Sequence, residues 1–531
     1  NNGVTGVVTE VTEDATYRNV TIINAGHLSI PDEVTLTVLN RIEMYEDGRL
    51  TLEASDSRLA GEPVLEITSG TNHLDVSHET AELPVFGEVT VFDGASLTHR
   101  SHSDSYDYSL RMEVSGDLTV EDAASISDAR KGYSSLNGPG GGLQGSNSGS
   151  GGGYGGVGGY GHDISPGGGV YGSISQPADL GSGGGRTSTY GVPGGAGGGL
   201  IRLDVAGTLQ VDGSLDVSGN AGGNNTGRCS GGGSGGSIHI TAGTISGIGS
   251  IFADGGNGLT STYSGGGGAG GRIAAYFAAD SFSGTVDASG GTGKEDGGAG
   301  TIYWRQDGQY PDLVVDNGGD AGAVMEINED ITFGNVTILN AGHLSIPDNI
   351  ILSVLNRIEM SEGGRLTFEA TDSRIAGEPV LEVISGTNHL DVADETIQLP
   401  IFSDVTVSDG AVLTHRTHTD SRDYSLRMEV SGDLTVESGG AIMAAGKGYS
   451  SLNGPGAGLQ GNNSGSGGGY GGIGGIGHDI SPGGDVYGSI SQPADFGSGG
   501  GRTSTYGVPG GAGGRIVRHD GTGDRRVGEE V

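Results

Sequence analysis

Lysine, cysteine and aromatic residues are scarce in this chain of 531 residues. Cys229 is the one cysteine, which excludes an intrachain disulfide, so stability has to come from packing and backbone hydrogen bonds. Asp and Glu outnumber Lys and Arg by 65 to 26, for a formal net charge of −39, and the basic residues are nearly all arginine. Such a chain repels polyanions, so we expect no nucleic-acid partner.

Long apolar runs are also missing. No stretch of about 18 apolar residues occurs, so no membrane-spanning segment is predicted. Aromatic residues make up 5% and hydrophobic residues 33% of the chain, which argues against several ordinary globular cores. Low hydrophobicity with high net charge is typical of disorder, but Val, Ile and Leu stand here in alternating runs, which disordered chains lack. The composition therefore favours an ordered, Gly-rich, all-β protein.

The strongest positive feature is a tandem repeat. Asn19 to Arg202 recurs as Asn335 to Arg518 without insertion or deletion, and 335 − 19 and 518 − 202 both give 316. Buried positions should accept only substitutions of similar volume, and Val34 becomes Ile350 while Leu52 becomes Phe368. A fixed period is typical of arrays that span distance or present surface.

Within each copy, short alternating runs such as Val34–Leu39 and Leu110–Val114 predict strands with one buried face. They return every ~8–12 residues, and recurring phrases of the type V-x-V-x-x-G-x-L favour a solenoid with coils of about 20–25 residues over a sandwich or barrel. The predicted sections are 1–137 (coils of the first copy), 138–199 (its Gly-rich segment), 200–316 (its closing coils), 317–453 (coils of the second copy), 454–515 (its Gly-rich segment) and 516–531 (a divergent polar tail).

The Gly-rich segment from Gly138 to Gly199 holds 28 glycines in 62 residues. One interpretation is a long flexible loop. Structureless insertions of this length are uncommon in compact domains, which favours order. The ordered alternative is a set of extended, polyglycine-II-like strands whose bare Cα atoms let neighbouring backbones hydrogen-bond.

The runs Ser230–Ile238 (SGGGSGGSI) and Ser264–Ile273 (SGGGGAGGRI), with the phrases GDLTV and GTLQV, resemble Gly-rich parallel β-helix proteins. These are bacterial surface and secreted proteins of the broad pectin-lyase-like and adhesin type. The resemblance implies a right-handed parallel β-helix (β-solenoid) with Gly-rich insertions and an extracellular or cell-surface location. It says little about chemistry, because that group includes adhesins, polysaccharide lyases and structural spacers.

One polar constellation has the ligand types of a Zn²⁺ or Ni²⁺ site. It comprises His99, His102 and Asp104, and returns in the second copy as His415, His418 and Asp420. Because residues three apart on a strand point to opposite faces, a turn would be required, and the alternative is a solvated turn. Ca²⁺ is the cation that the many carboxylates allow, but no calcium-binding repeat or EF-hand loop occurs, so no site is assigned.

Three classes of function follow. The leading prediction is a structural repeat protein that self-associates head to tail into a fibre, filament, stalk or surface layer. The alternative is an adhesin or glycan-binding module, with Tyr154, Tyr160 and Tyr171 of the Gly-rich segment as candidate contacts for a glycan or cell surface. The third is a polysaccharide lyase or hydrolase, which would need a cluster of carboxylates in a cleft. No catalytic motif is convincing, so the chain is not predicted to be an enzyme.

Overall fold

The computed structural model consists of strands, turns and extended segments, with no helix among the residues that it describes. The predicted all-β class is therefore confirmed. The structure describes residues 8–77, 82–100, 108–393, 398–417, 424–480, 482–491, 493, 495–514, 517–521 and 525–527. Within these ranges no helix is long and apolar enough to cross a membrane.

The chain divides into two compact units. The first comprises Asn1–Asn328 with Ala341–His343, and the second Glu329–Asn340 with Leu344–Val531. The main division thus falls at Asn328/Glu329, a little beyond the predicted seam between the two copies at residue 316. Each unit is described by itself below.

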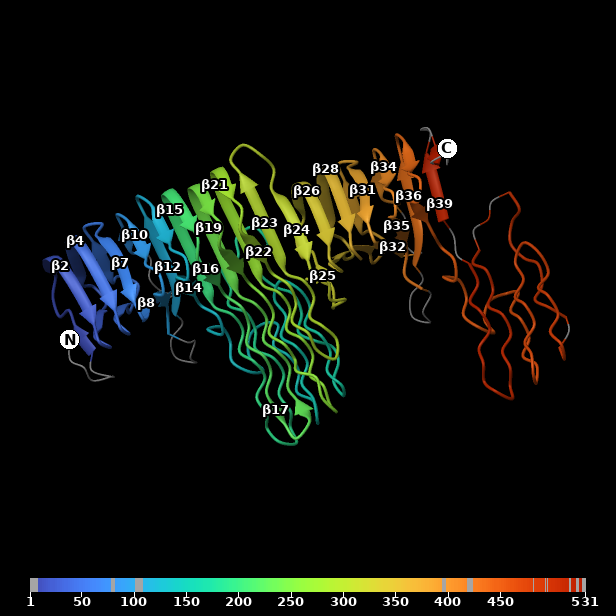
Figure 1. Cartoon of the computed structure of the whole chain (residues 1–531), viewed down its shortest axis with the longest axis horizontal. Helices are drawn as coiled ribbons and strands as arrows, with labels where there is room; N and C mark the ends of the chain where they lie inside the picture. Colours follow the sequence, from blue (N-terminus) through green and yellow to red (C-terminus); the bar gives the residue numbers. More distant parts are fainter. Residues whose placement is uncertain are drawn as a thin grey trace. The chain divides into compact units, whose positions relative to one another are not determined.

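In the first unit, most strands belong to one of two parallel ladders, and Figure 1 shows them side by side along the unit. In ladder 1, each strand pairs in parallel with the next member of the ladder along the chain. Its members are β2 (Ala15–Ile23), β4 (Thr35–Tyr45), β7 (Val64–Ser69), β10 (Val89–Val91), β13 (Leu118–Val120), β15 (Leu200–Val211), β19 (Ser237–Gly247), β21 (Arg272–Phe282) and β23 (Thr301–Gln306).

Ladder 2 is built from the shorter strands that alternate with these along the sequence. Its members, also parallel, are β1 (Val8–Glu10), β3 (His27–Ile30), β5 (Arg49–Leu52), β8 (Thr71–Ser77), β11 (Ser96–Thr98), β14 (Ser125–Ser127), β16 (Ser214–Asp216), β20 (Ser250–Phe252) and β22 (Thr285–Asp287). We call a stretch of chain that contributes one strand to each ladder a coil, a term that here refers only to the order of strands along the sequence.

The alternating sequence pattern explains the core. In β4, Leu36, Val38, Ile42 and Met44 are fully buried, while the residues between them are partly or fully exposed. Aliphatic residues from both ladders belong to one hydrophobic cluster, so the two ladders share a core. Burying each such side chain contributes about 1.5–3 kcal/mol to folding.

Some strands depart from the parallel pattern, so the sheets are mixed. Strand β12 (Tyr108–Val114) pairs in parallel with β9 (Val85–Phe86) and β15 but antiparallel with β8. Strand β24 (Asp312–Asp316) pairs antiparallel with β23, and the short strands β17 (Asn224–Asn225) and β18 (Arg228–Cys229) form a two-residue antiparallel pair.

The Gly-rich sequences form extended segments outside the two ladders. After β14, β16, β20 and β22 the chain leaves ladder 2, runs out as extended segments, and returns at the next strand of ladder 1. Figure 1 shows these segments lying side by side, with β17 at their far end. We call them the first bundle, which comprises residues 128–199, 217–236, 253–271 and 288–300. Gly231–Gly236 and Gly265–Gly271, which lie in the predicted closing coils 200–316, thus belong to the same bundle as 138–199.

Hydrogen bonds inside the bundle follow a three-residue period. Successive amides of Gly231–Gly236 donate to three neighbouring stretches of chain in turn, so every third amide returns to the same neighbour. The acceptors, in order, are the carbonyl oxygens of Gly185, Gly266, Asn220, Ser182, Ala269 and Val217, at 2.9–3.0 Å. A three-residue repeat with no hydrogen bonds inside the segment is the geometry of the polyproline II conformation. Backbone hydrogen bonds thus link the Gly-rich segments to one another in the first bundle.

Bare Cα atoms are what allow this packing. A Cβ added to Gly231 would lie 1.9 Å from the carbonyl oxygen of Ser150, and one added to Gly198 would lie 1.7 Å from that of Val217. Any side chain at these positions would separate segments that are held together by backbone hydrogen bonds.

The second unit repeats both features. Parallel pairing joins β26 (Ile331–Leu339), β28 (Ile351–Ser361), β31 (Val380–Ser385), β34 (Val405–Val407), β37 (Leu434–Val436) and β40 (Arg525–Val527). It also joins β29 (Arg365–Phe368), β32 (Thr387–Ala393), β35 (Val412–Thr414) and β38 (Ala441–Ile442), and it joins β36 (Tyr424–Val430) to β39 (Val517–Gly521). The Gly-rich residues 448–514 form a second bundle. Residues 517–521 and 525–527 of the predicted polar tail are strands.

Candidate functional site

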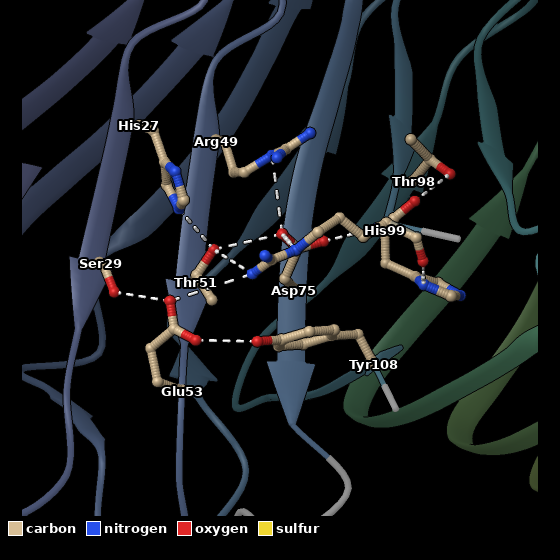
Figure 2. A network of polar contacts seen from close by, with 10 residues as sticks. His27, Ser29, Arg49, Thr51, Glu53, Asp75, Thr98, His99 and Tyr108 are labelled. Atoms are coloured by element: carbon tan, nitrogen blue, oxygen red, sulfur yellow. Dashed lines mark hydrogen bonds and ion pairs between the residues drawn. The ribbon is translucent and has the colours of Figure 1, made fainter. Parts of the chain in front are cut away.

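A cluster of polar side chains lies on ladder 2 of the first unit. The register places Ser29, Thr51 and Asp75 in one row across β3, β5 and β8, and His27, Arg49 and His73 in the row beside it. Figure 2 shows most of these side chains together with Glu53, Thr98, His99 and Tyr108. We call this set the polar ladder.

Asp75 is the centre of the polar ladder and is fully buried. Its carboxylate accepts hydrogen bonds from the Arg100 backbone amide at 2.7 Å, from Arg100 Nε at 2.9 Å and from the Thr51 hydroxyl at 3.2 Å. Arg49 Nε lies 3.6 Å away. A buried carboxylate needs such partners, because an unpaired charge in the interior is strongly unfavourable.

Glu53 forms the second centre. Its carboxylate accepts hydrogen bonds from the Ser29 hydroxyl and from the Tyr108 hydroxyl, both at 2.8 Å. The Arg100 guanidinium stacks over the Tyr108 ring at 4.1 Å from the ring centroid, a cation–π contact. Burial and the hydrogen bond to Glu53 raise the pKa of Tyr108 well above its ordinary value, so the phenol stays protonated as a donor.

Two histidines flank these centres in a neutral state. Burial lowers the pKa of His73 to about 4, with further lowering by the positive charge of Arg49. Burial and Arg49 also lower the pKa of His27, whose Nε2 lies 2.9 Å from the Thr51 hydroxyl. With a pKa of about 4, His73 does not exchange protons near neutral pH, which argues against a general acid–base role for it.

The second unit contains the same arrangement 316 residues later. Asp391 is fully buried and accepts hydrogen bonds from the Arg416 backbone amide at 2.6 Å and from Arg416 Nε at 3.0 Å. Tyr424 donates to Glu369 at 2.5 Å and lies under the Arg416 guanidinium at 3.8 Å. The carboxylates of both polar ladders thus point at side chains of neighbouring coils.

The predicted metal constellation is only partly described. His99 is fully buried, its Nδ1 donates to the Arg100 carbonyl oxygen, and its Nε2 lies 3.2 Å from the buried carboxylate of Asp128. In the second copy, Ala444 stands where the first has Asp128, and His415 Nδ1 donates to the Arg416 carbonyl oxygen at 2.8 Å. The other predicted ligands, His102, Asp104, His418 and Asp420, lie outside the described residues.

Among the residues that the structure describes, no group of three His, Cys, Asp or Glu side chains is arranged to hold a metal ion. Ca²⁺ therefore stays a prediction without an assigned site. His99 pairs with one carboxylate and one carbonyl group, an arrangement that joins β11 to the residue after β14.

The three predicted tyrosine contacts do not form an exposed row. Tyr154 is fully buried, and its hydroxyl lies 2.6 Å from the Ser237 hydroxyl. Burial raises its pKa to about 12. Tyr171 packs against it with ring centroids 4.7 Å apart and donates to the Leu180 carbonyl oxygen at 2.6 Å. Of the three, only Tyr160 is exposed, at 38%. Tyr154 and Tyr171 instead hold the bundle together.

Arg272 attaches the bundle to ladder 1. Its guanidinium is fully buried and donates twice to the Tyr171 carbonyl oxygen, at 2.9 and 3.1 Å. It also lies 5.5 Å from the centroid of the Tyr154 ring. The sequence did not single out Arg272, although it is the one charged residue directly after the Gly265–Gly271 run.

A surface groove of the first unit bears on the lyase or hydrolase prediction. It has a volume of about 460 Å³, and its lining includes three arginines and two carboxylates: Arg58, Arg111, Arg202, Glu82 and Glu113. Glu82 pairs with Arg58 at 3.6 Å. With two carboxylates, one of them paired with an arginine, this groove lacks the cluster of carboxylates that a lyase or hydrolase would need, so it gives that prediction no support.

Comparison of the chain with protein-family models, curated proteins and solved structures finds no match. The resemblance to β-helix surface proteins accordingly stays a prediction. Function has to be argued from the geometry alone.

The polar ladder could have been predicted from a regular spacing in the sequence. Its side-chain contacts step by one coil: His27 to Thr51, Ser29 to Glu53 and Thr51 to Asp75 all span 24 residues. Arg100 stands 25 residues after Asp75. Stepping through the chain at the predicted coil length would have brought these polar residues together.

Proposed function

We propose that the chain is a structural repeat protein of the extracellular space or cell surface, in which coils of a right-handed parallel β-helix stack into an elongated scaffold. The observation that carries this proposal is the pairing of ladder strands with strands one coil later, in both ladders. Continuous backbone hydrogen bonding of this kind supports a solenoid, whose stability comes from contacts between neighbouring repeats.

The polar ladders fit a mechanical role better than a catalytic one. Their carboxylates are occupied by arginine, hydroxyl and amide donors from adjacent coils. Such bonds fix the register of one coil on the next, because each donor reaches a partner only in the observed alignment. The first bundle adds backbone hydrogen bonds between segments that follow different coils.

The same proposal includes head-to-tail self-association. Strand β2 pairs with β4, and no other partner of β2 occurs among the described residues of the first unit, which leaves it an open edge. An unpaired strand edge is a template for another chain. Because the chain already repeats at a period of 316 residues, one unit is expected to follow another in the same direction across molecules.

Electron microscopy of the full chain in native salt tests this proposal. We expect filaments or elongated particles longer than one chain. Tyr17 of β2 is 52% exposed, and Tyr17→Lys places a charge on the open edge, so this variant should shorten or abolish the filaments. Ile248→Lys is the matched control, since Ile248 is 75% exposed in the turn between β19 and β20, in the middle of the ladders. Dispersed monomers of the unmodified chain under all salt conditions would refute the proposal.

A further inference from the structure

The surface groove of the first unit reverses the sign of charge that prevails in this chain. The chain has a formal net charge of −39, whereas three arginines against two carboxylates give the groove a net charge of +1. We call it the arginine groove. Its complete lining is Arg58, Leu59, Glu82, Leu83, Val85, Arg111, Glu113 and Arg202.

Two of these arginines are neighbours on adjacent strands. Strand β12 pairs in parallel with β15, and the register sets Arg111 opposite Arg202. On each strand the residues on both sides of the arginine are buried, so both arginines lie on the outer face of the sheet. Adjacent strands are about 4.8 Å apart, and like charges placed opposite each other at that spacing are destabilising.

Arg111 lacks a negatively charged partner. Its Nη2 donates to the Ser77 carbonyl oxygen, but its buried Nε has no hydrogen-bond partner within the part of the chain that the structure describes, and no carboxylate there pairs with it. Burial, and then the positive charge of Arg202, lower the pKa of Arg111. A guanidinium nevertheless stays protonated in proteins. A bound anion would therefore offset an unfavourable, partly buried charge.

The other two arginines have partners that leave them able to bind a ligand. Arg202 gives Nε and Nη2 to a single oxygen of Asp204, at 2.9 and 2.8 Å, so its Nη1 keeps its hydrogens for another acceptor. Arg58 lies 3.6 Å from Glu82, with the two side chains 51% and 67% exposed. An ion pair this exposed is weak, so an anion in the groove can displace Glu82 from Arg58.

The second copy keeps the arginines of the groove and loses one carboxylate. All three arginines recur 316 residues later, as Arg374, Arg427 and Arg518. Glu82 is the one lining residue whose charge changes, to Gln398. Arg427 Nη2 donates to the Ala393 carbonyl oxygen, which repeats the contact of Arg111. The difference between the copies thus removes a competitor for the arginines.

We propose that the arginine groove binds a small tetrahedral oxyanion, the sulfate or phosphate group of a free ion or of a sugar ester. One guanidinium fork takes two oxygens, so Arg111 and Arg202 side by side match an anion with at least three oxygens better than a single carboxylate. The net charge of the chain repels long polyanions, which favours a small ligand. Binding here is independent of head-to-tail assembly.

Isothermal titration calorimetry of the full chain with sodium sulfate, in sodium chloride at about 0.1 M to screen the overall charge, tests the proposal. An Arg427→Gln background removes the equivalent arginine of the second copy, so that one groove is titrated. We expect saturable binding, weakened at least about 10-fold by Arg111→Gln. Arg41→Gln is the matched control, because Arg41 is 45% exposed, pairs with Glu66 and does not line the groove; it should leave the affinity unchanged.

Glu82→Gln tests the groove from the opposite direction. The Glu82 side chain is 67% exposed, so this variant should fold with an unchanged circular dichroism spectrum even if Arg111→Gln does not. Because it removes the carboxylate that competes for Arg58, we expect sulfate to bind about 3-fold more tightly. An unchanged or weaker affinity would overturn the proposal.

Parallel titrations with inorganic phosphate, glucose 6-sulfate and sodium acetate distinguish the possible ligands. Tighter binding of glucose 6-sulfate than of sulfate would support a sugar ester as the ligand, and the reverse order would support the free ion. Three results would contradict the proposal. These are no saturable binding of sulfate or phosphate, binding of acetate as tight as that of sulfate, and equal weakening by Arg41→Gln and Arg111→Gln.

Discussion

Replacing Asp75 by Asn isolates the contribution of the polar ladder to coil stacking. The substitution preserves the volume of the side chain and removes its charge. Asp75 Oδ2 lies 2.9 Å from Arg100 Nε and 3.2 Å from the Thr51 hydroxyl, both donors. An amide cannot accept from all the groups that surround this carboxylate, so at least one buried donor loses its partner.

The magnitude follows from burial. Removing one partner of a buried ion pair costs about 3–5 kcal/mol. The side chains of Arg100 and Arg49 are 32% and 29% exposed, so water can hydrate part of the charge left behind. We therefore expect the free energy of local opening around Asp75 to fall by about 3 kcal/mol. This corresponds to a roughly 100-fold increase in the rate of amide hydrogen exchange.

Hydrogen exchange followed by mass spectrometry resolves this effect by segment. In Asp75→Asn, peptides covering β5 and β8 should exchange roughly 100-fold faster, while the equivalent peptides around Asp391 should not change. The second unit is thus an internal control in the same molecule. Glu66→Gln is a control for exposed charge, because Glu66 pairs with Arg41 at 2.9 Å with both side chains partly exposed, and it should change stability by less than about 1 kcal/mol. Equal effects of Asp75→Asn and Glu66→Gln would refute the reasoning.

Three further predictions concern the bundle and pH. Gly231→Ala places a Cβ 1.9 Å from the Ser150 carbonyl oxygen, so it should speed labelling of the buried thiol of Cys229, whose pKa is raised by burial. Gly169→Ala, which meets nothing within 4 Å, should leave that labelling rate unchanged. Arg272→Met should make the Gly-rich segment more sensitive to proteases without unfolding ladder 1, as measured by limited proteolysis and circular dichroism. Because the folded-state pKa of His73 is about 4, below the ordinary 6.5, stability should fall as pH decreases from about 6.5 to about 4. Thermal unfolding of His73→Gln should show a weaker dependence over that window.

The strands could be predicted from sequence because their pattern is local. Val34–Leu39 alternates apolar and polar residues, and the structure places it mostly in β4, with Leu36 and Val38 buried. Between the copies Thr35 is replaced by Ile351, and Ile351 is 36% exposed, so this change from polar to apolar does not fall on the buried face. Period-two alternation reports one buried face directly.

The polar ladder and the bundle could not be read in the same way, because both depend on contacts between distant segments. Asp75 meets Arg100 only when coils of 24 and 25 residues stack in register. Tyr154 was expected to face a ligand, yet its hydroxyl contacts Ser237, 83 residues away. Glycine runs give no periodicity of side chains from which packing could be inferred, since the packed groups are the backbones themselves.

Diffraction or cryo-electron microscopy of aligned filaments tests the central claim most directly. If the chain is a scaffold of stacked parallel coils, strands lie across the filament and repeat along its axis at about 4.7–4.9 Å, so a strong reflection at that spacing is expected on the meridian. Compact particles, or filaments with that spacing perpendicular to their axis, would contradict the account.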